Sequence, residues 1–337
     1  MSPPILTVEQ LRTYIHRGEQ TLRAVDGVSL SLHAGETLGI VGESGCGKSL
    51  TCLSIMGLIE EPVRIEPGSS IRLHDRELSE LSLRELETIR GNEISMIFQE
   101  PMTSLNPVWT VGDQIAEPVR IHRRAGAGEA RARAIEMLEL VGFPNPEERV
   151  DSYPHELSGG MQQRAMIAMA LACEPAVLIA DEPTTALDVT IQAEIIDLLA
   201  DLQRRLGMAM IFVSHDLGVV SQIADRVAVM YAGQVVEEGD VGDMFRRPRH
   251  PYTEGLLRCL PRLDRKVARL PVIPGDVPSP RDWPGGCRFH PRCAYAWERC
   301  LSAAPALTGG EHLSRCWLEE EPERRVPSRA GEPGADS

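Results

Sequence analysis

The chain has 337 residues, of which 42% are hydrophobic, 25% charged and 4% aromatic, proportions that are typical of a globular protein and exclude fibrous and disordered classes. Its 49 acidic against 35 basic residues give a net charge of -14, which disfavours nucleic acid and anionic lipid as partners. No apolar run approaches the roughly 18 residues that span a bilayer, and residues 1–11 lack the layout of a signal peptide, so we expect the chain in the cytoplasm.

Short apolar segments alternate with helical ones along the first two thirds of the chain. Each apolar segment has the length of a buried parallel strand, and helical spacing follows the first of them at residues 50–58. The predicted strands are residues 35–41, 93–98, 176–180 and 208–213. Residues 99–154 are charged and mostly helical, as in 128–141, which predicts a helical insertion. The alternation predicts an α/β fold.

A change in composition marks a second unit. Prolines become frequent after residue 245, which argues against long regular elements there. We therefore predict a main domain over residues 1–245, with a helical subdomain at about 100–165, and a small irregular extension over 246–318. Residues 319–337 are acidic and then rich in Pro, Gly and Ser, which predicts a disordered tail.

The segment after the first predicted strand has the pattern of a phosphate-binding loop, G-x-x-x-x-G-K-[ST]. In such a loop, backbone N–H groups and a helix N-terminus hold the phosphates, Lys48 places a charge on the β and γ oxygens, and the Ser49 hydroxyl can ligate Mg²⁺. The residues predicted to surround the nucleotide here are Gly42, Glu43, Ser44, Gly45, Cys46, Gly47, Lys48, Ser49 and Leu50.

Two carboxylates end the third predicted strand. Asp181 would hold Mg²⁺ through water, while Glu182 would polarise the attacking water as a general base. Strands of one parallel sheet bring their carboxyl ends together, so this pair would lie beside the phosphates. The alternative is an acidic surface pair that caps the following turn.

Residues 157–164, with the sequence LSGGMQQR, open an apolar helix. Ser158 caps that helix, and the amides of Gly159 and Gly160 lie at its positive end, which makes a second anion cradle. Gln162 belongs to the same predicted cradle. Serine-capped helix starts are common, so the interpretation depends on the position just ahead of the carboxylate strand.

With these motifs, the chain resembles the nucleotide-binding subunits of ABC transporters over about residues 5–245, and LSGGMQQR matches the family signature. The resemblance implies a P-loop NTPase cassette, with a RecA-like core, a helical subdomain and an antiparallel β subdomain. It also implies head-to-tail dimers that enclose each ATP. Ser158 and Gly160 would then serve the nucleotide of the partner subunit.

The resemblance also implies roles for single residues. Gln99 would contact Mg²⁺ and sense the transmembrane subunits, and Asp188 would end the D-loop. His215 would contact the γ-phosphate, and Tyr14 would stack on adenine. From the residues alone, a histidine such as His215 is more often a satisfied residue at a strand end, and a tyrosine such as Tyr14 is nearly as often a core residue.

Residues 247–253 (RPRHPYT) and 255–261 (GLLRCLP) resemble the C-terminal extension of the dipeptide and oligopeptide importer ATPases, a group that includes nickel importers. The resemblance implies an ATPase at the cytoplasmic face of the inner membrane. Its expected partners are two permease subunits, an extracytoplasmic peptide-binding protein and a second, similar ATPase in a heterodimer. The alternative for this segment is a proline-rich linker without function.

Eight cysteines divide into two groups. Those at 46, 52, 173 and 259 are scattered and predicted to be small buried residues. The other four have the spacing C-x5-C-x6-C-x15-C and are Cys287, Cys293, Cys300 and Cys316. Four thiolates suit a [4Fe–4S] cluster or zinc that staples the extension, and the peptide-importer resemblance favours [4Fe–4S]. His290 and His312 keep a mixed zinc site open.

Two readings compete with an importer ATPase. The first is a soluble ABC ATPase of DNA repair or translation, which the acidic charge, the single cassette and the importer-like extension disfavour. The second is a regulatory subunit that binds ATP without turnover, which the presence of Glu182 and His215 disfavours.

Overall fold

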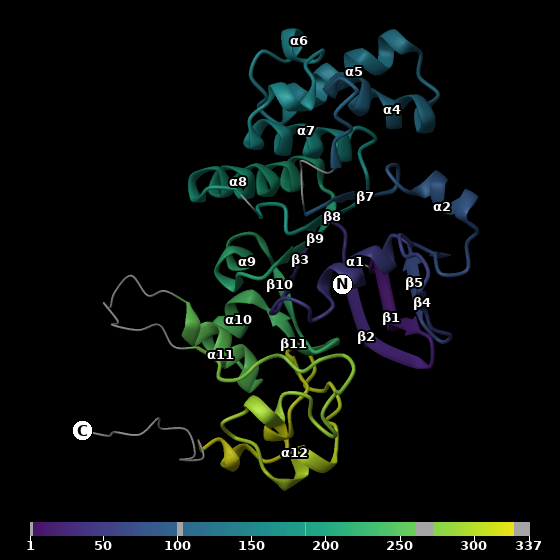
Figure 1. Cartoon of the computed structure of the whole chain (residues 1–337). Helices are drawn as coiled ribbons and strands as arrows, with labels where there is room; N and C mark the ends of the chain where they lie inside the picture. The colour runs from purple at the N-terminus through teal and green to yellow at the C-terminus, as the bar shows by residue number, and fades with distance from the viewer. Residues whose placement is uncertain (1–2, 100–103, 186, 261–271, 327–337) are drawn as a thin grey trace.

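The structure is a computed structural model that describes residues 3–99, 104–185, 187–260 and 272–326. Its centre is a seven-stranded sheet in the order β12-β11-β10-β3-β9-β8-β7 (Figure 1). The strands are β3 (Thr37–Val41), β7 (Ile94–Ile97), β8 (Val177–Asp181), β9 (Ala209–Ser214), β10 (Arg226–Tyr231), β11 (Gln234–Asp240) and β12 (Leu313–Ser314). The four predicted strands and the α/β class are confirmed.

Five strands of this sheet, from β10 to β7, run parallel. Val41 pairs with Ser214, and Asp181 pairs with Val213, so β3, β9 and β8 end at the same edge. Ligands of parallel α/β sheets bind outside this edge. The register therefore brings the predicted phosphate loop and the predicted carboxylates to one place.

Alternate residues of the sheet face two different layers. Leu178 and Phe212 pack toward the helices α8 (Val189–Leu206) and α9 (Leu217–Ile223). Ile179 and Ile211 pack toward α1 (Lys48–Ile55) and a second sheet, which is antiparallel. That sheet consists of β1 (Leu6–Arg17), β2 (Gln20–Leu32), β4 (Val63–Ile65), β5 (Ser70–Leu73) and β6 (Arg76–Glu77). This alternation explains why the central strands are apolar on both faces.

A helical subdomain occupies the end of the molecule at the top of Figure 1. Its elements are α4 (Val111–Arg123), α5 (Ala127–Leu140), α6 (Pro146–Arg149), η1 (Pro154–Glu156) and α7 (Gly159–Leu171). Short helix α2 (Leu83–Ile89) precedes it and begins with a capping box between Ser82 and Glu85. The predicted helical insertion therefore exists. Within the described parts of the chain, none of the helices combines the length and apolarity required to cross a bilayer.

The described part of the C-terminal extension, here residues 246–260 and 272–326, lies at the opposite end of the molecule (Figure 1). Its elements are α11 (Pro251–Cys259), η2 (His290–Arg292), α12 (Glu298–Ser302), β12, η3 (Trp317–Glu319) and η4 (Pro322–Arg324), and α10 (Val241–Arg246) leads into it. Residues 319–326, predicted as part of a disordered tail, contain the end of η3 and all of η4, and Arg325 donates hydrogen bonds to the carbonyls of Pro248 and Arg249. Residues 327–337 lie outside the described residues.

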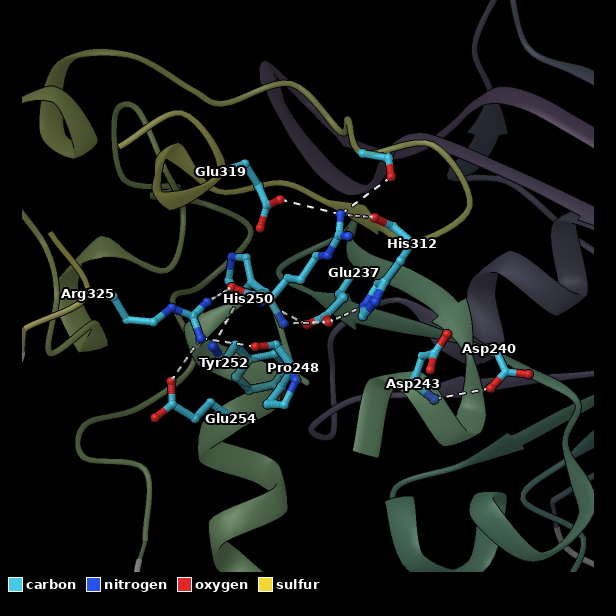
Figure 2. Close-up of polar contacts among 12 residues, drawn as sticks. Glu237, Asp240, Asp243, Pro248, His250, Tyr252, Glu254, His312, Glu319 and Arg325 are labelled. Carbon is cyan, nitrogen blue, oxygen red and sulfur yellow. Dashed lines mark hydrogen bonds and ion pairs between the residues drawn. The ribbon is translucent and has the colours of Figure 1, made fainter. Parts of the chain in front are cut away.

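A buried carboxylate joins the extension to the main sheet (Figure 2). Glu237 of β11 is fully buried and accepts hydrogen bonds from the backbone N–H groups of Arg249 and His250, each at 2.8 Å. His312 Nε2 lies 2.7 Å from the same carboxylate. Although burial raises the pKa of Glu237, these hydrogen bonds lower it below its ordinary value. The network fixes the start of α11 against the sheet.

Candidate nucleotide-binding site

The phosphate loop connects β3 to α1 and depends on glycines where side chains would collide. A Cβ at Gly42 would lie 2.2 Å from the carbonyl oxygen of Met230. Gly47 has φ of 104° and precedes the first residue of α1. The buried Lys48 folds back over this loop, and its Nζ donates to the carbonyls of Gly42 at 2.8 Å and Glu43 at 3.3 Å. The loop thus has the predicted form.

Ser49 and Asp181 come from different elements and meet at the loop. The Ser49 hydroxyl donates to Asp181 Oδ1 at 3.1 Å. Asp181 is the last residue of β8 and is buried, and burial together with the charge of Glu182 raises its pKa. A hydroxyl and a carboxylate are oxygen ligands of the kind that Mg²⁺ prefers, so this pair fits the predicted magnesium site.

Glu182 has a strained backbone and side-chain partners from four segments. Its φ is 46°, in the left-handed region that a residue other than glycine enters at a cost of roughly 1–3 kcal/mol. Its Oε2 accepts from Thr185 Oγ1 at 3.0 Å and Gln99 Nε2 at 3.2 Å, and lies 3.3 Å from His215 Nδ1. Lys48 Nζ lies 3.9 Å from its other oxygen. The structure therefore brings together the predicted catalytic residues Lys48, Gln99, Glu182 and His215.

The residues of the predicted second anion cradle at the start of α7 are partly exposed to solvent. Ser158 caps the helix by accepting from the N–H of Met161 at 3.4 Å, and Ser158 and Gly159 are exposed. Gln162 differs from the prediction, because it is buried and its Nε2 donates to the carbonyls of Pro154 and Leu157. Gln162 therefore shapes the loop instead of facing a ligand. Asp188, also predicted to bind nucleotide, caps α8 at the N–H groups of residues 190 and 191.

Tyr14 has partners of its own in the antiparallel sheet. Its hydroxyl donates to Asp26 Oδ1 at 2.7 Å, and Arg23 lies 5.9 Å from its ring centroid. Burial and the hydrogen bond to Asp26 raise its pKa to about 12. Arg288 of the extension pairs with the same aspartate. These contacts explain the residue structurally, and its stacking on adenine stays a prediction.

The four clustered cysteines line one small cavity of about 10 Å³ in the extension, together with aromatic side chains. Burial, with the neighbouring thiols, raises the pKa of Cys293 and Cys316 to about 12. Among the described residues, however, no group of three His, Cys, Asp or Glu side chains is placed to hold a metal ion. The structure therefore does not show the predicted metal staple, although the donor set of four thiols fits a group that binds thiolates.

Two other kinds of contact hold the extension in place, and no local sequence pattern indicates them: buried apolar side chains and the contact between His312 and Glu237. Phe289, Tyr295 and Leu318 are buried, and Phe289 joins the core of the main domain. His312 is held by Glu237, which disfavours its part in a mixed zinc site. The extension is thus packed on the cassette and does not depend on a metal for all its contacts.

Fold and site together define an ATPase of the P-loop class. The sequence model of the family described as ABC transporter matches residues 25–185, and that described as the oligopeptide/dipeptide transporter C-terminal region matches residues 236–300. The chain is 51% identical to the oligopeptide transport ATP-binding protein AppD of Bacillus subtilis (strain 168), over 94% of this chain and 97% of AppD. It is 50% identical to the dipeptide transport ATP-binding protein DppD of Escherichia coli (strain K12), over 90% of this chain and 92% of DppD.

Solved structures agree with the fold. A dimeric ATP-binding cassette in a post-hydrolysis state with ADP and Pi has a TM-score of 0.63 at 29% identity, over 70% of this chain and 98% of that one. The cbiO1 protein of Clostridium perfringens, part of an ABC transporter complex, has a TM-score of 0.62 at 28% identity, over 73% of this chain and 92% of that one. This chain belongs to the ATP-binding subunits of ABC transporters, and it is an ATPase of that family.

Proposed function

We propose that this chain hydrolyses ATP to power the import of dipeptides or oligopeptides, at the cytoplasmic face of the inner membrane. The observation that carries the chemistry is the convergence of Lys48, Ser49, Asp181 and Glu182 where β3 and β8 end. Peptide as the substrate class is supported by the match of the extension and by the relatives named for oligopeptide and dipeptide transport.

In this proposal, the phosphates of ATP lie against the N–H groups of the loop and Lys48. Ser49, Asp181 and Gln99 would hold Mg²⁺, which neutralises phosphate charge when bound. Glu182 accepts a proton from the water whose oxygen attacks the γ-phosphorus, while the bond from that phosphorus to the bridging oxygen breaks and ADP leaves. His215, at 3.3 Å from Glu182, orients the carboxylate for that transfer.

The same proposal completes each site with a second ATPase subunit. Ser158 and Gly159 are exposed at the N-terminus of α7, where a γ-phosphate would meet free N–H groups and the positive end of the helix. The relative solved as a dimer with ADP and Pi supports this arrangement. We propose that the second subunit is a similar but different ATPase, and that the sandwiched nucleotides hold the two together.

A groove on the helical subdomain is a candidate docking site for the permease subunits. It has a volume of about 500 Å³ and lies on α4 and the segment before it. Trp109 and Ile121 line the groove, and these two residues are 43% and 64% exposed. Exposed apolar side chains gathered in one groove are typical of a protein interface. Two permeases and an extracytoplasmic binding protein complete the proposed importer.

For the four cysteines, we propose a [4Fe–4S] cluster with a structural role, with zinc as the alternative. The support is the shared cavity and the all-thiol donor set, which suits iron–sulfur clusters. An ultraviolet–visible spectrum of protein purified without oxygen, with iron, sulfide and zinc analyses, tests it. A brown protein with iron and sulfide is expected, and a colourless protein with one zinc per chain would refute the cluster.

The transport proposal is tested with the chain assembled in proteoliposomes with its permeases, binding protein and partner ATPase. We expect ATP hydrolysis that rises when a dipeptide or oligopeptide is added, together with uptake of that peptide. Stimulation by nickel ions and not by any peptide would replace peptide with metal as the substrate. If the parent assembly hydrolyses ATP neither with peptide nor with nickel ions, the proposed function itself is refuted.

A further inference from the structure

The C-terminal extension contacts the phosphate loop through an ion pair that connects distant parts of the sequence. Arg292 of η2 holds both carboxylate oxygens of Glu43, with Nη1–Oε2 at 2.6 Å and Nη2–Oε1 at 3.0 Å. The Arg292 side chain is only 5% exposed. A two-pronged pair of this kind fixes direction as well as distance, unlike an exposed pair of surface charges.

A second contact reaches the backbone of the same residue. The N–H of Glu43 donates to Tyr252 Oη at 2.9 Å. Tyr252 is fully buried and packs on Tyr231 and Phe289, with ring centroids 4.7 and 5.4 Å away. It lies in the first turn of α11, which the network around Glu237 fixes (Figure 2). Glu43 is therefore held at its backbone and at its side chain.

Glu43 and the residue before it contact Lys48, the lysine that is predicted to bind phosphate. Lys48 Nζ donates to the carbonyl of Glu43 at 3.3 Å and to the carbonyl of Gly42, the preceding residue, at 2.8 Å. The N–H of Glu43 and the carbonyl of Gly42 belong to one peptide unit, so the Tyr252 hydroxyl that accepts from this N–H also fixes the direction of the carbonyl that holds Lys48 Nζ. The extension thereby sets the position from which Lys48 reaches a phosphate.

Arg292 is itself immobilised, so it can act as a fixed support. Its Nε donates to the carbonyl of Pro274 at 3.0 Å and its Nη2 to that of Ile273 at 3.3 Å. Its Cζ lies 5.8 Å from the ring centroid of Tyr231, within reach of a cation–π interaction. A lysine could supply the charge but not the two-pronged geometry.

We propose that Arg292 and Tyr252 are positioning residues of the ATP site, through which the C-terminal extension sets the affinity of the phosphate loop for nucleotide. The inference rests on the proposed function, because the group they position is the lysine of the proposed ATP site. Neither residue touches the nucleotide in this scheme. Their effect reaches ATP through Glu43 and Lys48.

The test uses the full chain and four variants: Arg292→Met, Arg292→Lys, Glu43→Gln and the double variant Glu43→Gln/Arg292→Met. Arg299→Met is the matched control, because Arg299 lies in the same extension and its ion pairs, with Glu320 and Glu321, stay within it. Nucleotide affinity is measured with a fluorescent ATP analogue, and KM and kcat are measured in the assembled transporter. Thermal unfolding of each variant checks that it is folded.

We expect Arg292→Met to raise the dissociation constant and KM for ATP about tenfold, in the range of coupled neighbours, with kcat within about twofold. Arg292→Lys should recover part of the loss. The double variant should bind no more weakly than Arg292→Met, because both changes remove one pair. Arg299→Met should match the parent protein. A loss of stability without loss of affinity would indicate a purely structural role and overturn the proposal.

Two further results decide the remaining cases. Affinity of Arg292→Met within about twofold of the parent, or strictly additive effects in the double variant, would also overturn the proposal. If Arg292→Met does not fold, Tyr252→Phe decides, because it removes only the oxygen that accepts from Glu43, and we expect affinity about threefold lower. A parent chain that binds no ATP would instead refute the proposed function.

Discussion

Because of His250, the free energy of unfolding of this protein is expected to fall as the pH falls. Its side chain is buried, and its Nδ1 accepts the N–H of Tyr252 at 3.1 Å, which requires an unprotonated nitrogen (Figure 2). Burial lowers the pKa of His250 from 6.5 to about 4; the charge of Glu237 opposes this shift, and those of Arg315 and Arg325 add to it. Between about pH 4 and pH 6.5, His250 therefore carries a proton in the unfolded chain but not in the folded chain.

The sign and size of the pH effect on stability follow from this difference in pKa between the folded and unfolded chain. Where the unfolded state binds more protons, stability rises with pH, so the contribution is complete above pH 6.5 and is lost as pH falls toward 4. Each pKa unit is worth about 1.4 kcal/mol, which gives about 3 kcal/mol in full and about 2 kcal/mol between pH 7.5 and pH 5.

Urea unfolding at pH 7.5 and pH 5 measures this loss. His250→Asn keeps an acceptor for the Tyr252 N–H but cannot titrate, so its stability should change about 2 kcal/mol less than that of the parent. His74→Asn is the control, because His74 is exposed and asparagine tolerates its positive φ of 52°. Equal pH dependence of the parent and His250→Asn would refute the reasoning.

Three further changes test the site. Lys48→Met should weaken binding of a fluorescent ATP analogue at least about tenfold, because the charge on the phosphates is lost; unchanged affinity would contradict the role of Lys48. Thr185→Val removes a 3.0 Å hydrogen bond to Glu182 and should lower kcat several-fold with KM little changed, whereas an effect on KM alone would indicate another role. Gly42→Ala places a Cβ 2.2 Å from a backbone carbonyl and should lower the free energy of unfolding by about 2 kcal/mol or more, in excess of Gly45→Ala, whose Cβ would meet open space; equal losses would refute the predicted clash.

The sequence predicted the parts of the site that depend on local pattern. The loop before Lys48 lies between a strand and a helix that are contiguous in the chain, so its form could be read from spacing. Asp181 and Glu182 follow a short apolar strand directly, and parallel strands end at one edge. General rules of α/β folds then place the carboxyl ends of β3, β9 and β8 at one edge of the sheet.

Features that depend on distant partners could not be predicted. Arg292 meets Glu43 across 249 positions of sequence, and no local pattern indicates this pair. The orientation of Gln162 depends on two carbonyls of the preceding turn, so a motif gave its neighbourhood but not its direction. Strand β12 has two residues, too few for a periodic signal, and becomes a strand only by pairing with β11.

The rate of phosphate release by Glu182→Gln in the assembled transporter tests the central claim most directly. Glutamine keeps the shape of the side chain but cannot accept the proton of the attacking water, so we predict a fall of at least about 100-fold with ATP affinity nearly unchanged. Glu80→Gln, at an exposed position, should behave as the parent. Turnover of Glu182→Gln within about tenfold of the parent would contradict the account.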